Sequence, residues 1–361
     1  MPTSLLARLA SSALTIVLLS MLYGMLTNWA SVLKNRGRIG DWLPPRVPLS
    51  PPWGGAEVAI AFLAWFLLQN VFAVAYFYLA MRPADGPGLT FNEMIALSTF
   101  SNLLIVAFLL DLLRRRAGGT LVGTVMPEEG LMAQVRLGVR TALLMAPVVL
   151  ALNLGLVKLW QLVAPDQNVH PLAKMMQSDS SPLTLALAFL AATIAAPATE
   201  ELMFRVILLG WLVRPRHVSA PGDEDVEDPQ PTPRPGWLAD PATRANLAVS
   251  LAFGLIHFGQ WPAPVGIFVL SMALGELYLR TGSLVAPFVA HATFNGVSTV
   301  ALSLALLNTP AGAAKPGPKP AKIPAASAAK EAVERAIPDP LPVTPGVNAE
   351  SPLKNGDSSD F

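Results

Sequence analysis

The feature that most constrains this chain is a succession of long segments without a charged residue. A membrane-spanning helix needs about 20 mostly apolar residues, because the hydrocarbon core of a bilayer is about 30 Å thick. Eight segments reach or approach this length, and the fifth continues through polar residues to Val213. The segments are Leu9–Leu33, Val58–Met81, Met94–Leu110, Thr141–Val157, Pro182–Thr199, Ala245–Ile256, Val265–Gly275 and Ser283–Asn308. The sixth and seventh are short for spans. We predict an all-α fold, a polytopic membrane helix bundle of about eight transmembrane helices.

The composition supports a membrane class. Charged residues make up 14% of the chain and hydrophobic residues 53%, whereas soluble chains carry about 25% charged residues. The formal net charge is +1, so no basic excess points to a nucleic-acid partner. The chain has no cysteine, which excludes disulfide bonds, cysteine-ligated metal sites and thiol nucleophiles.

Two segments differ from the rest in composition. Residues 215–243 include seven prolines and an acidic run, and residues 309–361 include ten prolines with many alanines and lysines. Such segments cannot bury a core, so we predict a disordered acidic loop and a disordered tail. The remainder of 1–308 is the predicted transmembrane body, with a motif-bearing core at about 182–300.

The distribution of lysine and arginine predicts an orientation. The loops after the first, third, fifth and seventh segments hold fourteen of these residues, and the other loops hold three: Arg82, Lys158 and Lys174. By the positive-inside rule the first group of loops is cytoplasmic. The high content of alanine, proline and arginine suggests a bacterial source. We expect a multi-pass protein of the bacterial inner membrane, surrounded by lipid. The sequence does not address its oligomeric state.

Ionisable residues inside three apolar segments are the candidate functional residues, because a buried charge in a membrane is costly. At 1.5 Å per helical residue, the acidic residue and the two histidines lie roughly 17–21 Å from flanking arginines of the same set of loops. They can therefore meet at one level near the middle of the membrane. The residues are Glu200, Glu201 and Arg205 in the first segment, Phe253 and His257 in the second, and His291 and Asn295 in the third.

Helical spacing assigns partners in the first segment. Glu201 and Arg205 are four residues apart and can pair on one face, whereas Glu200 points about 100° away from Glu201. We predict a structural Glu201–Arg205 pair that leaves Glu200 free for a site. The two glutamates are not expected to face the same site.

The same spacing applies to the other two segments. His291 and Asn295 share a helical face, and Phe253 can pack beside His257. Taken singly, a buried histidine is usually a hydrogen-bonded packing residue, and an asparagine can join helices. Their convergence with Glu200 at one depth favours a functional site.

Such a set can activate water. Glu200, alone or with His257, would act as general base, and His291 and Asn295 would donate hydrogen bonds to the oxyanion of an attacked peptide carbonyl. A second possibility is that Glu200, His257 and His291 bind a divalent metal such as zinc, since two histidines and a carboxylate are a known catalytic zinc set. The residues leave open whether a cofactor is needed.

Three motifs resemble those of the CPBP intramembrane proteases, which include type II CAAX prenyl endopeptidases and bacteriocin-processing or immunity proteins. They are E-E-x-x-x-R at Glu200–Arg205, F-x-x-x-H at Phe253–His257 and H-x-x-x-N at His291–Asn295. The resemblance covers about a third of the chain. It implies an eight-helix fold, peptide-bond hydrolysis within the membrane and a catalytic Glu200. It also implies His257 beside Glu200 at the water, and His291 with Asn295 at the oxyanion.

The sequence therefore predicts an intramembrane endopeptidase acting on a peptide or protein substrate. Its identity, and whether it is prenylated, are not specified by the sequence. The alternative is a non-catalytic membrane protein, such as an immunity factor, that binds a partner and retains the fold.

Overall fold

The computed structural model describes residues 5–35, 43–79, 89–127, 130–163, 181–215 and 237–307. Among these residues the only paired extended backbone is an isolated bridge between Val122 and Met126. All other regular structure there is helical, which confirms the predicted all-α class.

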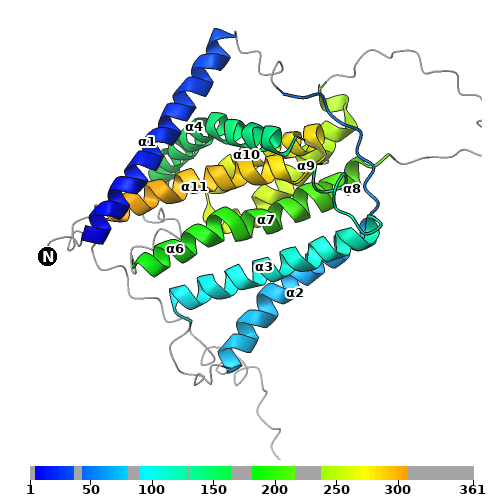
Figure 1. Ribbon diagram of the computed structural model, residues 1–361, viewed down its shortest axis with the longest axis horizontal. Helices are drawn as coiled ribbons and strands as arrows, with labels where there is room; N and C mark the ends of the chain where they lie inside the picture. The colour runs from blue at the N-terminus through cyan, green and yellow to red at the C-terminus, as the bar shows by residue number, and fades with distance from the viewer. Residues whose placement is uncertain are drawn as a thin grey trace, which may run out of the picture. The chain divides into compact units, whose positions relative to one another are not determined.

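The elements follow one another along the chain as a series of long helices with short interruptions (Figure 1). They are α1 (Leu5–Lys34), α2 (Gly55–Leu79), α3 (Phe91–Arg116), α4 (Leu131–Val163), α6 (Pro182–Leu190), η2 (Ala191–Ala195), α7 (Ala196–Glu201), η3 (Leu202–Leu209), α8 (Gly210–Val213), η4 (Trp237–Ala239), α9 (Pro241–Ile256), η5 (Phe258–Gln260), α10 (Ala263–Thr281) and α11 (Val285–Leu307).

Seven of the described helices are long and apolar enough to cross a membrane, with the stretch from α6 to α8 counted as one. The helix that falls short is α9, the sixth predicted segment, which has 16 residues. The expected set of about eight spans thus consists of seven full-length helices and one short one. These helices make the chain a multi-pass membrane protein.

Local sequence signals fix where the helices begin and end. The Ser181 side chain accepts a hydrogen bond from the Thr184 amide at the start of α6, and Pro182 occupies the first turn. Asp240 caps α9 in the same way, again with a proline next in the chain. Both arrangements satisfy amide groups that lack a partner at a helix start. Gly282 ends α10 with a φ of 62°, a conformation that glycine adopts without strain.

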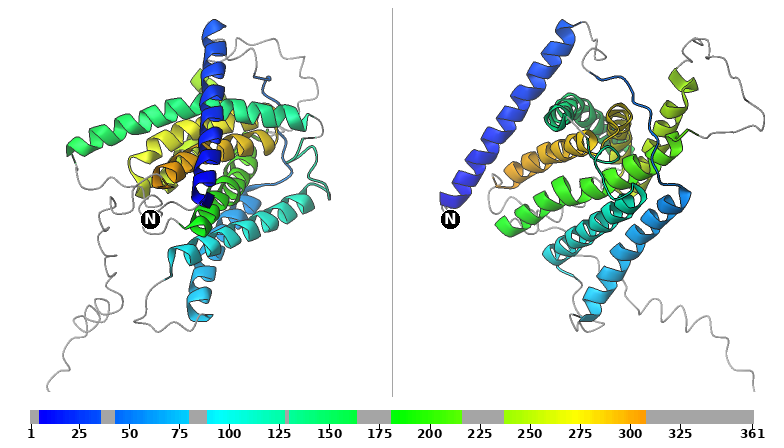
Figure 2. Two further views of the ribbon diagram at one scale, coloured as in Figure 1. Left: turned by 60° about the vertical axis from the view of Figure 1, so that its left-hand side comes forward. Right: turned by 45° about the vertical axis from the view of Figure 1, so that its right-hand side comes forward.

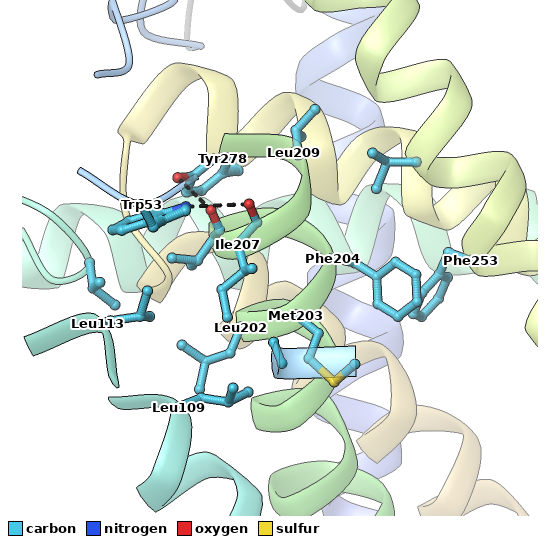
Figure 3. Packing of buried hydrophobic residues seen from close by; sticks show 14 of the residues in the cluster. Trp53, Leu109, Leu113, Leu202, Met203, Phe204, Ile207, Leu209, Phe253 and Tyr278 are labelled. Carbon is cyan, nitrogen blue, oxygen red and sulfur yellow. Dashed lines mark hydrogen bonds between the residues drawn. The ribbon is translucent and has the colours of Figure 1, made fainter. Parts of the chain in front are cut away.

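The helix formed by α6, η2, α7, η3 and α8 is the central element, and it contacts α2, α3, α9, α10 and α11. Six of the eight η3 residues are buried apolar side chains, on every side of the helix. A helix that is apolar all round needs neighbours on all sides. Figure 3 shows this packing, with Phe204 against Phe253 and with Trp53 donating to the Ile207 carbonyl.

The first helix lies at the periphery, against α4 and α11 (Figure 1 and Figure 2). Large apolar side chains such as Ile16, Tyr23 and Leu26 are exposed on it. Exposed apolar side chains in a helix of this length are expected where a membrane protein faces lipid acyl chains.

An extended segment, residues 43–54, holds the ends of three helices together, and we name it the 43–54 strap. Arg46 forms ion pairs with Asp240 before α9 and with Glu276 of α10. Arg280 donates to the Pro44 carbonyl at 2.6 Å, and Arg214, after α8, donates to the Trp53 carbonyl at 3.3 Å. The three arginine-bearing ends of α8, α9 and α10 therefore lie on one side of the bundle.

The domain predictions are only partly covered by the described residues, all of which belong to the compact unit Met1–Gly317. Of the predicted loop 215–243, residues 216–236 lie outside the described residues, whereas Trp237–Ala239 form a turn of 3₁₀ helix and Pro241 begins α9. The predicted tail at 309–361 also lies outside the described residues.

Candidate functional site

Two π-helical stretches flank the short helix α7, which carries Glu200 and Glu201. They are η2 before it and η3 after it. Pro197 lies in the first turn of α7, and a proline inside a helix removes one backbone hydrogen bond, which a π-helical turn can accommodate. Such turns are rare and occur often at functional sites. They also rotate the following side chains relative to a regular α-helix.

Glu201 and Arg205 form the predicted pair. The Arg205 Nε lies 3.1 Å from the Glu201 Oε2, and the two side chains are 1% and 0% exposed. Arg205 also donates from Nη2 to the Ser271 Oγ of α10 at 2.8 Å. Its guanidinium lies 4.5 Å from the centre of the Phe253 ring, a favourable cation–π arrangement. The arginine is therefore held from three directions.

His291 of α11 lies between the two glutamates. Its Nδ1 is 2.7 Å from the Glu201 Oε1, and its Nε2 is 3.7 Å from the Glu200 Oε2. A carboxylate can only accept, so Nδ1 carries the hydrogen of the shorter contact. This leaves Nε2 as the atom that faces Glu200.

Both carboxylates lie beside the same imidazole, Glu201 at hydrogen-bonding distance and Glu200 at 3.7 Å, and this sharing of His291 was not predicted. The two ring nitrogens of His291 point in different directions, so carboxylates on successive residues can each reach one of them. The Glu201–His291 contact was missed because it joins residues 90 positions apart, and helical spacing reports only on neighbours within a few residues.

Glu200 is the more accessible of the two glutamates. Its side chain is 24% exposed, whereas that of Glu201 is fully buried. Glu200 is therefore the acidic group of the cluster that an incoming molecule can reach.

His257 is the residue that ends α9, and its ring bonds back to the last turn of that helix. Its Nδ1 lies 2.8 Å from the Phe253 carbonyl oxygen of the last helical turn. A carbonyl can only accept, so this nitrogen carries a hydrogen and Nε2 is left free of it in the neutral ring. The rings of Phe253 and His257 are 4.9 Å apart, so the predicted packing of these two residues is present. The Phe253 ring is also 6.1 Å from that of His291.

Asn295 lies one turn after His291 on α11, as the spacing predicts, but its amide is engaged elsewhere. The Asn295 Nδ2 donates to the Ala192 carbonyl in η2 at 2.8 Å. This bond joins α11 to the π-helical stretch before Glu200. An amide nitrogen has two hydrogens, so one hydrogen of Asn295 is committed to the backbone.

The described residues include no group of three or more histidine, aspartate or glutamate side chains arranged to hold one metal ion. Glu200, His257 and His291, which we named as zinc ligands only in the case of a metal-dependent protein, are therefore not gathered as such a group in this structure.

A cavity of about 440 Å³ lies at the end of the bundle near the 43–54 strap. It is lined by residues of the strap, of segment 123–127 and of the turn between α10 and α11, together with Gln134 and Tyr278. None of the seven predicted site residues lines it. The cavity and the glutamate–histidine cluster are therefore separate features.

The structure thus places Glu200 and Glu201 beside His291 inside a bundle of membrane helices. Residues 182–297 match the model of a family described as type II CAAX prenyl endopeptidase Rce1-like. The match covers about a third of the chain, and it agrees with the resemblance of the three motifs to the CPBP intramembrane proteases. Neither a curated protein nor a solved structure matches the chain.

Proposed function

We propose that this protein is an endopeptidase that hydrolyses a peptide bond inside the membrane, with Glu200 as general base. The observation that carries the proposal is the position of Glu200 beside His291 Nε2, at 3.7 Å, in a region that matches an intramembrane protease family. This distance exceeds that of a direct hydrogen bond and is compatible with a water molecule that bonds to both atoms.

The proposed reaction begins when Glu200 takes a proton from water. The water oxygen then bonds to the peptide carbonyl carbon, and the carbonyl oxygen becomes an oxyanion. When this intermediate collapses, the carbon–nitrogen bond breaks and the leaving amine receives the proton from Glu200. A positioned general base of this kind contributes typically 10²- to 10⁴-fold to a rate.

The two histidines support the glutamate in this proposal. His257 presents its Nε2 while its Nδ1 bonds to the Phe253 carbonyl, so it can share the proton of the water with Glu200. His291 is held by Glu201, whose carboxylate stabilises the protonated ring, as a buried carboxylate does in hydrolase triads. In the resting protein the ring carries its hydrogen on Nδ1; once it has also taken up a proton from solvent at Nε2, this second nitrogen can donate a hydrogen bond to the oxyanion.

Asn295 is the second proposed oxyanion donor, and its bond to Ala192 constrains how it can act. It can donate through the second hydrogen of its amide nitrogen or, after rotation of the side chain, exchange the Ala192 carbonyl for the oxyanion. We therefore propose His291 as the principal donor and Asn295 as the group that accompanies it on the same helical face.

The proposed substrate is a peptide or protein anchored in the membrane, and the proposed location is the bacterial inner membrane. The name of the matched family refers to CAAX prenyl substrates. A farnesylated CAAX peptide is therefore a suitable first probe, beside its unprenylated counterpart.

The test compares wild type with Glu200→Gln, which keeps the size of the side chain and removes its basicity. We expect the wild type alone to generate new peptide termini in membranes of producing cells, measured by mass spectrometry of protein termini, and alone to cleave a quenched probe peptide. Equal unfolding temperatures would establish that both proteins are folded. Identical sets of termini and equal cleavage would contradict the proposal and favour the non-catalytic alternative. Addition of EDTA tests the zinc expectation separately.

A further inference from the structure

We propose that Ser271 of α10 is a positioning residue for His291 and acts through Arg205 and Glu201. The inference rests on the proposed function for its meaning in catalysis, but the contacts that carry it do not depend on that function. Ser271 lies in none of the three motifs.

Four buried side chains from three helices form a continuous chain of polar contacts. Ser271 Oγ is 2.8 Å from Arg205 Nη2, Arg205 Nε is 3.1 Å from Glu201 Oε2, and Glu201 Oε1 is 2.7 Å from His291 Nδ1. The exposed fraction is 0% for Ser271 and 6% or less for the other three. His291, the last residue of this chain of contacts, also faces Glu200 through its Nε2. The orientation of His291 is thus connected to a hydroxyl group on a helix that carries no predicted site residue.

The Ser271 hydroxyl sets the rotation of the Arg205 guanidinium. The face of this planar group is fixed by the Phe253 ring, but a ring face does not fix rotation within the plane. Among the described residues, Nη1 has no hydrogen-bond partner and Nη2 reaches Ser271 alone, through its Oγ and, at 3.5 Å, its carbonyl. Without the hydroxyl, Nη2 keeps only the 3.5 Å contact with the Ser271 carbonyl, so the arginine side chain can shift across the ring face and Glu201 can shift with it.

Rotation of the Glu201 carboxylate changes the hydrogen-bond acceptor that faces His291 Nδ1. One carboxylate oxygen now accepts from His291 Nδ1 while the other lies beside Arg205. This arrangement selects the tautomer with the hydrogen on Nδ1, because an acceptor bonded to one imidazole nitrogen determines which of the two is protonated. Loss of the arrangement allows the hydrogen to move to Nε2, the atom that faces Glu200.

If Ser271 only filled space, Ser271→Ala would leave the His291 tautomer unchanged, because alanine fills nearly the same volume as serine. The chain offers a matched control in Ser250 of α9. It is also fully buried, and its hydroxyl donates to the Asn246 Oδ1 rather than to the arginine. Ser250→Ala removes one buried hydroxyl without touching the contact chain.

The experiment records ¹⁵N NMR spectra of histidine-labelled protein in detergent micelles, where the presence of only four histidines makes assignment practical. The His291 signals are identified by their loss in His291→Ala. We expect one Nδ1-protonated tautomer in wild type, Ser250→Ala and Ser271→Thr, and a mixture of tautomers in Ser271→Ala. Cleavage of a quenched farnesylated CAAX peptide should fall in Ser271→Ala by about 10- to 100-fold in kcat with KM unchanged, the scale of a small misplacement of a catalytic group.

The outcomes separate the two proposals. An unchanged His291 spectrum in Ser271→Ala overturns the inference, whatever the activity. Unfolding of Ser271→Ala under conditions in which Ser250→Ala is folded overturns it as well, in favour of a structural role. A tautomer mixture in Ser271→Ala, with no cleavage by wild type, supports the positioning role and counts against the proposed function.

Discussion

At the scale of single residues, the most unusual feature is a group of buried charges inside the bundle. Glu201 and Arg205 are almost completely enclosed. Removing two charges from water costs several kcal/mol per ion, and the cost is recovered only when the contacts are well formed. Here Arg205 has Glu201, Ser271 and the Phe253 ring around it. The arrangement makes each member dependent on the others.

Replacement of Glu201 by glutamine should destabilise the protein by about 3 kcal/mol, because it leaves the buried arginine without its nearest counter-charge. The measurement is the unfolding temperature in detergent, compared with that of Asp111→Asn. Asp111 pairs with Arg115 on the surface, where their side chains are 55% and 78% exposed. Exposed pairs contribute little, so this control should unfold at the wild-type temperature. Equal stability of wild type and Glu201→Gln would show that the arginine does not need the charge.

Helical spacing predicted the residue-scale features that lie within one helix. The Glu201–Arg205 pair, the packing of Phe253 on His257 and the common face of His291 and Asn295 all follow from it. The bond from Asn295 to Ala192 and the contact of Ser271 with Arg205 join different helices. Such contacts depend on how the helices pack, and spacing along one helix contains no information about them.

At the scale of elements, close helix packing depends on glycine at defined places. A Cβ atom at Gly138 of α4 would lie 2.6 Å from the Ala286 carbonyl oxygen of α11, whereas one at Gly155 of the same helix meets nothing within 4 Å. Small residues at membrane helix interfaces allow such close approach of backbones. The two glycines therefore have different roles in one helix.

Gly138→Ala should destabilise the protein by roughly 1–3 kcal/mol, because α4 and α11 must move apart to accommodate the methyl group. Gly155→Ala should leave stability unchanged or raise it by up to about 1 kcal/mol, since alanine favours the helix. Thermal unfolding of both variants in the same detergent gives the comparison. A Gly138→Ala variant as stable as Gly155→Ala would contradict the close approach of α4 and α11 at this position.

The 43–54 strap predicts a pH-dependent attachment of α9. Burial alone would raise the pKa of Asp240, but hydrogen bonds from the Thr243 hydroxyl, from the amides of Ala242 and Thr243 and from Arg46 lower it, and the net direction is down. A carboxyl group whose pKa is lower in the folded state stabilises the protein above its unfolded pKa of about 3.9, and this stabilisation is lost as the pH falls through the folded value.

Asp240→Asn should therefore unfold at a lower temperature than wild type at pH 7, and this difference should disappear as the pH falls below about 4. Asparagine can still cap the helix, so the difference isolates the charge. Comparison with Asp240→Asn at each pH removes the contribution of other acidic groups such as Glu276. A difference that persists unchanged at low pH would contradict the lowered pKa of Asp240.

At the scale of the whole molecule, the arginine-bearing ends of α8, α9 and α10 lie together at the 43–54 strap. The charge-free runs predicted the helical class and the approximate position of each helix. They did not predict the strap, because its contacts join segments more than a hundred residues apart. The number of full-length spans could not be predicted from the sequence, because a short charge-free run does not show where its helix ends.

The positive-inside rule predicts that the strap side faces the cytoplasm. Because the chain has no cysteine, single cysteines can be labelled without background. The variant Leu238→Cys, changed before α9, should react with a membrane-impermeant maleimide only after the membrane is opened. The variant Val163→Cys, changed at the last residue of α4, should react in intact cells. The opposite labelling pattern would reverse the assigned orientation.

The shortness of α9 has a consequence for the supply of water. At 1.5 Å per residue its 16 residues span about 24 Å, less than the 30 Å of a hydrocarbon core. A span that is too short is accommodated by local thinning of the bilayer. Its far end is His257, so the aqueous phase on that side comes closer to the glutamates than it would beside a full-length helix. The proposed reaction consumes one water molecule for each bond that is cut, and the shortness of α9 gives that water a shorter path for replenishment.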